Sequence, residues 1–517
     1  MPGRRRRGFA GGFIVALCFP LAAQSTRSFA GLKGFDEWIA PTMAEWHVPG
    51  VAVGAIKDGQ IVLARGYGWR DVEAKEPVTS RTVMGIGSNT KSFTAVLMAM
   101  LVDERKLDWD TPVRAYLPDF QLFDEYATRE MTPRDLVTHR SGLPRHDNVW
   151  YGRPLTREEL YRRLQYLEPS ASFRSRYQYQ NLMFMTAGYL TERITGVSWD
   201  AQIRDRIFMP LGMTRSNTTV TESPSAGDFA YPYTWRDDSL VRLPFRNIDA
   251  IGPAGSINST VDDMLKYIQF RLDRGAAGDR RMVSPASEVQ LQSPQMVSGG
   301  SVEYEELGHG TYGLGLGVST YRGRKVVSHG GGIDGFISAM AWLPNDRIGV
   351  MVLTNLSGNN PVPSLVQRNL FDRLLGLPPI DWVARQRKAD SAASERAGKE
   401  RDRIDQQRRP GTQPTHPLSA YAGSFQHPGY GKLTVAVDGA SLTITLDPHR
   451  ASLSHYHYDV WRIQDPGGVV PFGGLLRFLT NEKGEVDRVA VPLEPNLTVA
   501  VPGSSERALK PITFVRS

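Results

Sequence analysis

A long polar stretch towards the C-terminal end divides this chain and constrains how it can fold. Residues 384–415 contain almost no large apolar side chain, and nine lysines and arginines stand against five acidic residues between 384 and 409. Such a stretch cannot bury its backbone in a core. Part of it can form a solvated helix, and its end, with Pro, Gly and Thr, reads as a linker. We therefore predict two domains, residues 32–380 and 416–517, joined by a charged linker over 381–415.

The apolar residues on the two sides of this stretch follow different periods. Residues 35–48 have helical spacing, residues 50–68 read as two strands around a turn at Asp58 and Gly59, and mixed helical and strand segments follow. After residue 416, short alternating segments are separated by Gly, Pro, Asn and Asp. We therefore predict a mixed α/β (α+β) domain followed by a small all-β barrel or sandwich.

The N-terminal segment MPGRRRRGFAGGFIVALCFPLAAQS predicts an export signal over residues 1–24. Four arginines precede an apolar run of about a dozen residues, and Ala22 and Ala23 are the small residues typical of a cleavage site. That run is too short to span a bilayer, and no later run reaches about 18 apolar residues, so no membrane span is expected. The mature protein is expected to be periplasmic or secreted. Cys18 is the only cysteine, so cleavage leaves neither disulfides nor a cysteine-bound metal.

The formal net charge of +7 does not predict a nucleic-acid partner. Residues 4–7 contribute +4 and residues 384–409 contribute another +4, which leaves the remainder near −1. Binding to a nucleic acid needs basic side chains clustered on a folded surface, and the sequence shows no other basic run. A nucleic acid is therefore not expected as a partner.

The segment GIGSNTKSFTAVLMAML, residues 85–101, has the apolar spacing of a buried helix but carries Lys91 in its first turn. A cation there opposes the helix dipole by up to about 1 kcal/mol, so it is unfavourable for stability. Ser88 lies three residues earlier and therefore on the same helical face. Burial lowers the pKa of a lysine, and a neutral amine can take the proton of a serine hydroxyl. Ser88 and Lys91 are therefore candidates for a nucleophile and its base.

Two further motifs strengthen this interpretation. A single Ser-x-x-Lys pattern is weak evidence, because a serine cap followed by an exposed lysine is common. Acyl-transfer enzymes with this pattern also carry a second polar element and a third element on a strand. Here Tyr-Gln-Asn at residues 179–181 stands on the loop entering an amphipathic helix, and His-Gly-Gly-Gly at residues 329–332 follows an apolar strand.

With these motifs in this order, the chain resembles the class C β-lactamase-like serine hydrolases, a family that also holds DD-peptidases, D-aminopeptidases and esterases. The resemblance covers roughly residues 35–375 and includes LDWDTPVRAYLPDF, MTPRDLVTHRSGLP and GPAGSINSTVDDMLKYI. It implies an antiparallel sheet flanked by helices, a helical region, and an active site in the cleft between them. The tail, with LSAYAGSF and SHYHYDVWRI, resembles the small β-barrel appended to several of these relatives.

The resemblance also implies roles for individual residues, with neither a metal nor a cofactor. Ser88 is implied to be the acylated nucleophile and Lys91 its base. Tyr179 is implied to relay a proton to the leaving group, and Asn181 to contact the substrate amide. The implied substrate-binding strand carries His329, Gly331 and Gly332, and the backbone N–H groups of Ser88 and Gly332 form the implied oxyanion hole.

The strand motif departs from the β-lactamase pattern. His329 stands where β-lactamases and DD-peptidases have lysine, and Gly330 replaces threonine or serine. A histidine with a reference pKa near 6.5 is mostly neutral at pH 7, so the contacts available to a substrate carboxylate are weakened. Efficient β-lactam hydrolysis is therefore not expected. A histidine followed by glycines at this strand is similar to the pattern of the D-aminopeptidase and esterase branches of the family.

Other polar residues are expected to be structural. His455 and His457 alternate with tyrosines and share one face of a strand, but the sequence supplies no further ligands for a metal. His139 is expected to hold a turn by hydrogen bonds, and residues 305–309 to lie on a loop at the rim of the cleft. No metal site is predicted.

Together these patterns predict an exported serine hydrolase that forms a covalent acyl-enzyme. The expected substrates are amides or esters, namely short peptides, including those with D-residues, and small esters. Two alternatives stay open: a penicillin-binding sensor that acylates with slow or no deacylation, and a true class C-type β-lactamase. Turnover separates an enzyme from a sensor, because a sensor releases a single burst of product. The oligomeric state is not predicted.

Overall fold

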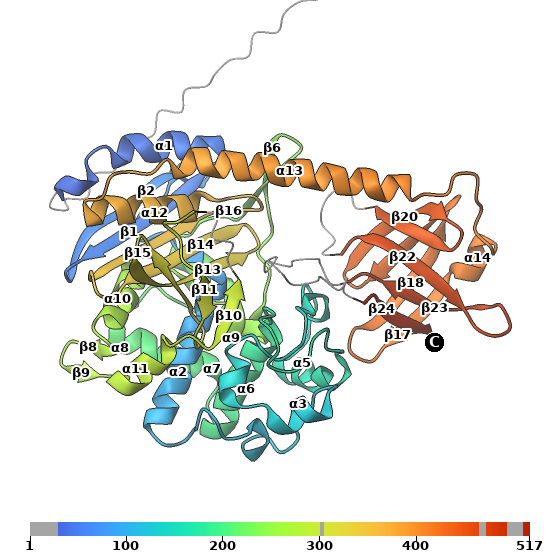
Figure 1. Ribbon diagram of the computed structural model, residues 1–517, viewed down its shortest axis with the longest axis horizontal. Helices are drawn as coiled ribbons and strands as arrows, with labels where there is room; N and C mark the ends of the chain where they lie inside the picture. The colour runs from blue at the N-terminus through green and yellow to red at the C-terminus, as the bar shows by residue number, and fades with distance from the viewer. Residues whose placement is uncertain (1–28, 300–303, 465–471, 494–509) are drawn as a thin grey trace, which may run out of the picture.

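The computed structural model describes residues 29–299, 304–464, 472–493 and 510–517. The predicted export signal lies outside these residues. Figure 1 shows a larger part built of a sheet and helices, a smaller β-barrel at the C-terminal end, and one long helix running between them. The predicted fold, a mixed α/β unit with an antiparallel sheet followed by an all-β barrel, is confirmed.

The larger part is organised around an antiparallel sheet of nine strands. The predicted turn at Asp58 and Gly59 joins its first two strands, and both residues have positive φ, 51° and 78°, as a two-residue hairpin turn requires. The strands, in sheet order, are β10 (Met296–Gly299), β11 (Gly310–Tyr312), β12 (Gly317–Tyr321), β13 (Arg324–Ile333), β14 (Phe336–Leu343), β15 (Ile348–Thr354), β1 (Gly50–Lys57), β2 (Gln60–Asp71) and β3 (Glu76–Pro77).

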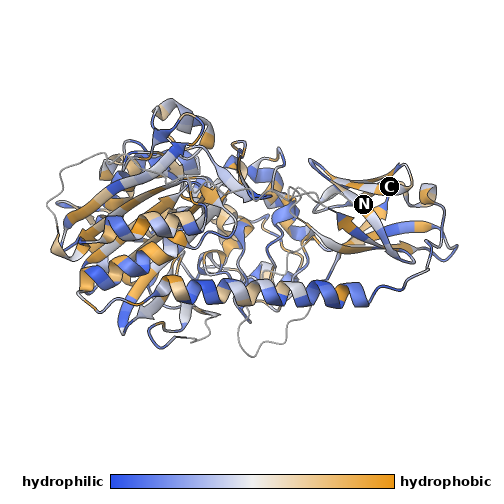
Figure 2. Cartoon of the chain, turned by 90° about the horizontal axis from the view of Figure 1, so that it is seen from above, coloured by the Kyte–Doolittle hydropathy of each residue, from blue (hydrophilic) through white to orange (hydrophobic). Residues whose placement is uncertain are grey.

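Both faces of this sheet are covered, because successive side chains of a strand point to opposite faces. In β15, Val350 and Val352 belong to the core shared with α1 (Phe35–Glu45) and α12 (Val362–Leu375). Met351 and Leu353 belong to the core on the other face, with α10 (Val261–Leu272) and α2 (Thr90–Asp103). Figure 2 shows the apolar residues gathered in the sheet and in the helices that cover it.

The helical region lies on the α2 side of the sheet. Residues 90–101 of α2 are all buried, which is why this segment is apolar nearly all round. The other helices of this region are α3 (Glu125–Glu130), α4 (Pro133–Leu136), α5 (Arg157–Arg163), α6 (Asn181–Thr195), α7 (Trp199–Ile203), α8 (Met209–Leu211), α9 (Gly252–Gly255) and α11 (Pro285–Leu291). The 3-10 turn before α2, η2 (Gly87–Asn89), lies beside β13, and Lys91 in the first turn of α2 meets Asn181 at the start of α6.

The C-terminal part is a closed barrel of eight strands. It closes because β17 pairs with β24, and its interior is filled by side chains such as Phe425, Trp461 and Phe514. A short helix, α14 (Leu418–Tyr421), precedes it. The strands are β17 (Gly423–His427), β18 (Gly431–Asp438), β19 (Ser441–Leu446), β20 (His449–His457), β21 (Val460–Gln464), β22 (Gly474–Thr480), β23 (Val486–Val491) and β24 (Ile512–Arg516).

Most of the polar stretch is one helix, α13 (Trp382–Gln406), in which only Trp382 is buried. Its first half contacts the larger part, where Trp46 Nε1 donates to Asp390 Oδ2 at 3.0 Å. Its last turn contacts the barrel, where the Tyr456 hydroxyl donates to the carbonyl of Ile404. The helix therefore touches both parts at its two ends (Figures 1 and 2). Within the described ranges, no helix is both long and apolar enough to cross a membrane.

Candidate active site

Ser88 and Lys91 meet at the start of α2. Ser88 lies in the 3-10 turn η2 (Gly87–Asn89), which leads directly into α2, and its side chain is partly exposed. Lys91 is in the first turn of α2 and is fully buried. Its Nζ lies 3.0 Å from Ser88 Oγ. The two residues that the sequence places on one helical face are thus in hydrogen-bond contact.

The other two contacts of Lys91 decide what its amine can do. Nζ donates to Asn181 Oδ1 at 2.8 Å and to the Ala254 carbonyl, in α9, at 2.7 Å. Both oxygens can only accept, so they use two amine hydrogens, and the third direction points to Ser88 Oγ. Burial lowers the pKa of Lys91 well below its usual value, Arg145 lowers it further, and Asp147 opposes them. A neutral Lys91 therefore turns its lone pair towards the serine hydroxyl.

The turn that carries Ser88 is held against the sheet. Asn89 Nδ2 donates to Ser338 Oγ in β14 at 2.7 Å, and Ser338 donates to the Ile86 carbonyl at 2.9 Å. Glycines allow the close approach, because a Cβ at Gly87, whose φ is +51°, would lie 2.6 Å from the backbone nitrogen of Gly332 in β13. The nucleophile turn thus packs backbone against backbone on the end of β13.

Gly331 completes this contact from the strand side. A Cβ at Gly331 would overlap the carbonyl oxygen of Ile86. Gly331 of the third motif therefore has a structural reason, which is that no side chain fits at this position between β13 and the nucleophile turn. Gly331 and Gly332 thus lie against the turn that carries Ser88. The oxyanion hole expected from the sequence stays a prediction.

Tyr179 and Asn181 reach the site from the loop before α6. Gln180 caps this helix, its side chain accepting from the backbone N–H of Leu182 at 2.8 Å, and Asn181 is the first helical residue. The Tyr179 ring centroid lies 4.8 Å from Lys91 Nζ. Burial raises the pKa of Tyr179, and its hydrogen bond with Ser88 lowers that pKa by less. Tyr179 therefore stays protonated at neutral pH.

His139 supports the loop that carries Tyr179. Its Nδ1 accepts from the backbone N–H of Gln180 at 3.0 Å, and its carbonyl accepts from the backbone N–H of Gln178 at 2.7 Å. The ring packs on Tyr179 with centroids 4.2 Å apart. Burial lowers the pKa of His139 well below its usual range, and Lys91 adds to this. The neutral imidazole holds the turn.

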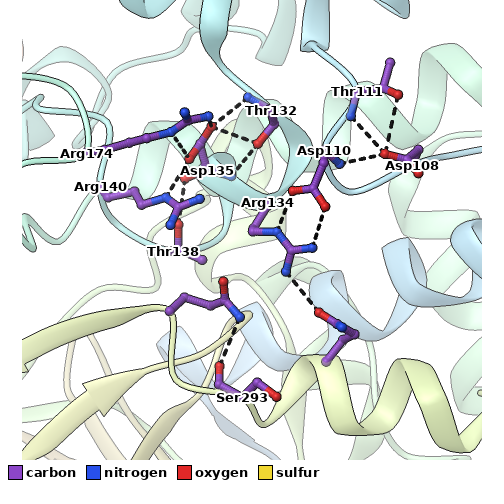
Figure 3. A network of polar contacts seen from close by, with 12 residues as sticks. Asp108, Asp110, Thr111, Thr132, Arg134, Asp135, Thr138, Arg140, Arg174 and Ser293 are labelled. Carbon is purple, nitrogen blue, oxygen red and sulfur yellow. Dashed lines mark hydrogen bonds and ion pairs between the residues drawn. The ribbon is translucent and has the colours of Figure 1, made fainter.

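A buried carboxylate braces the same loop. Asp135 is the third residue of α4 and is fully buried. It binds Arg140 Nε at 2.5 Å and Arg174 Nη2 at 2.6 Å (Figure 3). Arg140 follows His139 directly, and Arg174 lies five residues before Tyr179. The Asp135 carboxylate therefore joins the segment of His139 to the segment of Tyr179. Burial opposes ionisation of Asp135, but Arg174 and Arg140 hold its pKa below the usual value.

Both ring nitrogens of His329 form hydrogen bonds within the protein. Its Nδ1 donates to the Gly330 carbonyl at 2.6 Å, so in the neutral ring Nε2 accepts from the Tyr312 hydroxyl at 2.8 Å. Burial lowers the pKa of His329 to about 3, with Lys91 contributing. The ring is therefore neutral at physiological pH.

Some functional candidates were not visible in the sequence pattern. Asp147 accepts from Asn181 Nδ2 at 2.9 Å, and Arg145 lies over the Tyr179 ring, 5.0 Å from its centroid. Both stand on a loop where no periodicity or motif distinguishes them. Glu306, expected on a loop at the rim of the cleft, binds Arg385 of α13 at 3.0 Å.

Among the residues that the structure describes, no group of three or more His, Cys, Asp or Glu side chains could hold a metal ion. His455 Nε2 contacts the Tyr458 carbonyl at 2.9 Å, a local hydrogen bond within the β20–β21 turn.

Known proteins show the same fold and sequence features. Residues 35–375 match the family model described as Beta-lactamase, and residues 407–501 match one described as a domain of unknown function (DUF3471). Unguisins hydrolase ungD' of Aspergillus campestris (strain IBT 28561) is 31% identical over 424 residues, which cover 78% of each chain.

Solved structures with the same fold support this family match. The octameric penicillin-binding protein homologue from Pyrococcus abyssi is similar with a TM-score of 0.61 and 27% identity, over 90% of this chain and 98% of that one. The D-amino acid amidase from Ochrobactrum anthropi SV3 shares the fold with a TM-score of 0.57 and 21% identity, over 67% of this chain and 97% of that one. Because the family match spans most of the chain and contains the whole Ser88–Lys91 arrangement, this protein belongs to the beta-lactamase family and is a serine hydrolase.

Proposed function

We propose that this protein cleaves amide or ester bonds of short peptides or small esters through an acyl-enzyme on Ser88, and that it is exported. The observation that carries the proposal is the contact of 3.0 Å between Lys91 Nζ and Ser88 Oγ, with the other two directions of the amine occupied by acceptors. A buried lysine in this setting is a base for the serine rather than a surface cation.

In the acylation step, Ser88 Oγ attacks the carbonyl carbon of the substrate and its proton passes to Lys91 Nζ. The backbone N–H groups of Ser88 and Gly332 donate to the oxyanion, a type of contact whose loss costs about 10² to 10³ in rate. The Tyr179 hydroxyl protonates the leaving group and is reprotonated from Lys91. The bond to the leaving group breaks, and Lys91 is neutral again.

In the deacylation step, a water molecule attacks the ester carbonyl. One of its protons passes to Lys91, and the same proton is returned to Ser88 Oγ as that oxygen leaves. The product is the free acid, and the enzyme returns to its starting state. The step uses only Lys91 and the groups that hold its amine, so no cofactor enters the scheme.

The charges around β13 support a substrate without a carboxylate at this position. His329 is neutral, and two nearby arginines are already paired, Arg145 with Asp147 at 2.5 Å and Arg246 with Asp334 at 2.7 Å. A lost charge-assisted hydrogen bond lowers discrimination in favour of a carboxylate by roughly 10- to 150-fold. D-residues in the substrate are suggested by the D-amino acid amidase among the structural neighbours.

The test is intact-mass detection of acyl adducts on the wild-type chain and on Ser88→Ala, with a panel of amides, esters and β-lactams. Side-by-side kcat/KM values for a p-nitrophenyl ester, a D-alanyl amide and nitrocefin then rank the substrates. We expect adducts on Ser88 only, and continued turnover of the ester and amide. A single burst without turnover indicates the sensor, and nitrocefin turning over fastest by about tenfold or more indicates a β-lactamase.

Export is a separate part of the proposal. The arginines, the apolar run and the small residues of 1–24 support a cleaved signal peptide. N-terminal sequencing of the protein from the periplasmic or culture fraction is expected to begin close to residue 25. A full-length chain that stays in the cytoplasm would contradict this part and leave the catalytic proposal intact.

A further inference from the structure

The loop of residues 145–153 lies between the active site and the C-terminal barrel and contacts both. On the active-site side, Asp147 Oδ1 accepts from Asn181 Nδ2 at 2.9 Å and from Trp150 Nε1 at 2.9 Å. Its Oδ2 accepts from Arg145 Nε at 2.5 Å. Both oxygens of Asp147 are therefore engaged by residues of the site or of the loop itself.

This contact fixes which way the Asn181 amide faces. An ionised carboxylate can only accept, so Asn181 must turn its Nδ2 to Asp147 and its Oδ1 to Lys91. When Asn181 Oδ1 faces the amine, Lys91 donates a hydrogen to it, and the lone pair of Nζ points to Ser88. With the amide reversed, an N–H of Asn181 would compete with the Ser88 hydroxyl for that lone pair. The direction of the base thus depends on Asp147.

On the other side, the barrel holds the residues that flank Asp147. The His146 ring contacts the Tyr430 hydroxyl through Nδ1 at 2.7 Å, and Asn148 Nδ2 donates to the Leu493 carbonyl at 2.5 Å. His146 Nε2 donates to the Glu168 carbonyl at 3.0 Å, so in the neutral ring Nδ1 accepts from Tyr430. The residues before and after Asp147 are therefore bound to the barrel by side chains that are nearly fully buried.

Two more observations fit a loop that the barrel holds in shape. His146 has a φ of 50°, in the left-handed region that non-glycine residues adopt at a cost and only where the surroundings impose it. Further along the loop, the Tyr151 carbonyl contacts His449 Nε2 of β20 at 3.1 Å. The barrel thus contacts the loop on both sides of Asp147 and again at Tyr151.

We propose that Asp147 is a positioning residue that orients Asn181 and Lys91 towards Ser88, and that the C-terminal barrel keeps Asp147 in place through Tyr430 and Leu493. This inference rests on the proposed role of Lys91 as base. It makes the barrel a part of the catalytic unit, although the barrel supplies no residue that touches the reacting atoms.

The first test compares Asp147→Ala with Asp147→Asn in the full-length protein. The alanine variant removes the acceptor, and we expect acylation by a p-nitrophenyl ester to slow by about 10- to 100-fold, as for other small misplacements of a catalytic group. The asparagine variant keeps an oxygen of the same shape and is expected to retain more activity. Acylation of the alanine variant within about twofold of wild type would overturn the inference.

The pH profile separates positioning from folding. Asp147→Asn removes a negative charge that raises the pKa of Lys91, so the acidic limb of kcat/KM is expected to move to lower pH. A variant that was merely less stable would keep the limb in place. The other charged or titratable groups that face Lys91 are unchanged in this variant: Arg145, His139, His329 and Tyr179.

The second test isolates the barrel. Tyr430→Phe removes only the hydroxyl that contacts His146, and Tyr456→Phe is the matched control, because its hydroxyl binds Ile404 of α13 and not the loop. We expect Tyr430→Phe to slow acylation by about 3- to 10-fold and the control to stay within about twofold of wild type, with similar melting temperatures. Equal rates for the two variants would overturn the role of the barrel.

The outcomes also separate this inference from the proposed function. If the wild-type chain forms no adduct on Ser88, the proposed function fails. If wild type acylates normally and the Asp147 and Tyr430 variants do as well, only the inference fails.

Discussion

His329 and Tyr312 are joined by a hydrogen bond of 2.8 Å that leaves the imidazole without a free nitrogen, since Nδ1 is bound to the Gly330 carbonyl. The position where the sequence suggested a weakened contact for carboxylates is therefore occupied by a neutral, internally bonded ring. Because its pKa is lowered to about 3, this ring does not change charge between pH 5 and pH 8.

We therefore predict that His329→Gln leaves the acidic limb of the kcat/KM profile unchanged. Replacing a neutral ring by a neutral amide does not alter the charge that faces Lys91. The measurement is kcat/KM for a p-nitrophenyl ester across pH 4.5 to about 9 in both proteins. A limb that shifts with the substitution would show that His329 carries charge in the working range.

Lys91→Arg is predicted to slow acylation strongly although it keeps a cation. The lowered pKa of Lys91 allows the amine to be neutral, whereas guanidinium does not lose its proton at working pH. In wild type the rate should rise with pH through the pKa of Lys91, because only the neutral amine accepts the serine proton. We expect labelling by a fluorophosphonate to slow by about 10² to 10⁴-fold.

The control for this prediction is Ser88→Ala, which should show no labelling and keep its melting temperature, because Ser88 is partly exposed and the substitution leaves little cavity. Near-normal labelling of Lys91→Arg would mean that Lys91 is only structural. Persistent labelling of Ser88→Ala would mean that another residue is the nucleophile.

Asp135→Asn is predicted to destabilise the larger part by about 3 kcal/mol, since it leaves the guanidinium groups of Arg140 and Arg174 without their buried partner. The pKa of Asp135 is lowered in the folded protein, so its contribution is present above the unfolded pKa and is lost as pH falls through the folded one. Thermal unfolding at pH 7 should show the full difference, and the difference should shrink below about pH 4. A constant difference would point to a packing effect.

Limited proteolysis is predicted to cut first within residues 407–417. This segment follows α13, has no regular structure before α14 and is mostly exposed, whereas the backbone of α13 is hydrogen-bonded along its length. Two fragments of roughly 400 and 100 residues are expected by mass spectrometry. First cleavage inside the nine-stranded sheet would contradict this prediction.

The parts of the fold and site that could be predicted depend on neighbours in the sequence. Ser88 and Lys91 are three residues apart, so helical geometry alone brings them together. The hairpin at Asp58 and Gly59 and the alternating strands of the barrel are likewise local patterns. For these features, a short window of sequence contains the physical cause.

The parts that could not be predicted depend on residues far apart in the chain. Asp147 meets Asn181 across 34 residues, and His146 meets Tyr430 across 284. A single aspartate on an irregular loop looks the same whether it binds water or orients an active site, because no periodicity connects it to its partner.

The helical structure of α13 could be predicted only in part, for a different reason. Its residues lack an apolar face, so periodicity cannot distinguish a solvated helix from a linker. It is helical because Ala, Arg, Lys, Glu and Gln are good helix formers, helped by pairs such as Glu395–Lys399 at 2.6 Å.

The length of α13, 25 residues, also contributes to the geometry between the two parts. Each residue adds about 1.5 Å of length and about 100° of rotation, so one inserted residue would turn the barrel away from the loop of residues 145–153. Seven inserted residues would nearly restore the phase but lengthen the span by about 10 Å. No insertion restores both, so the residue count of α13 is constrained independently of the side chains, such as Asp390 and Arg385, that bind the larger part.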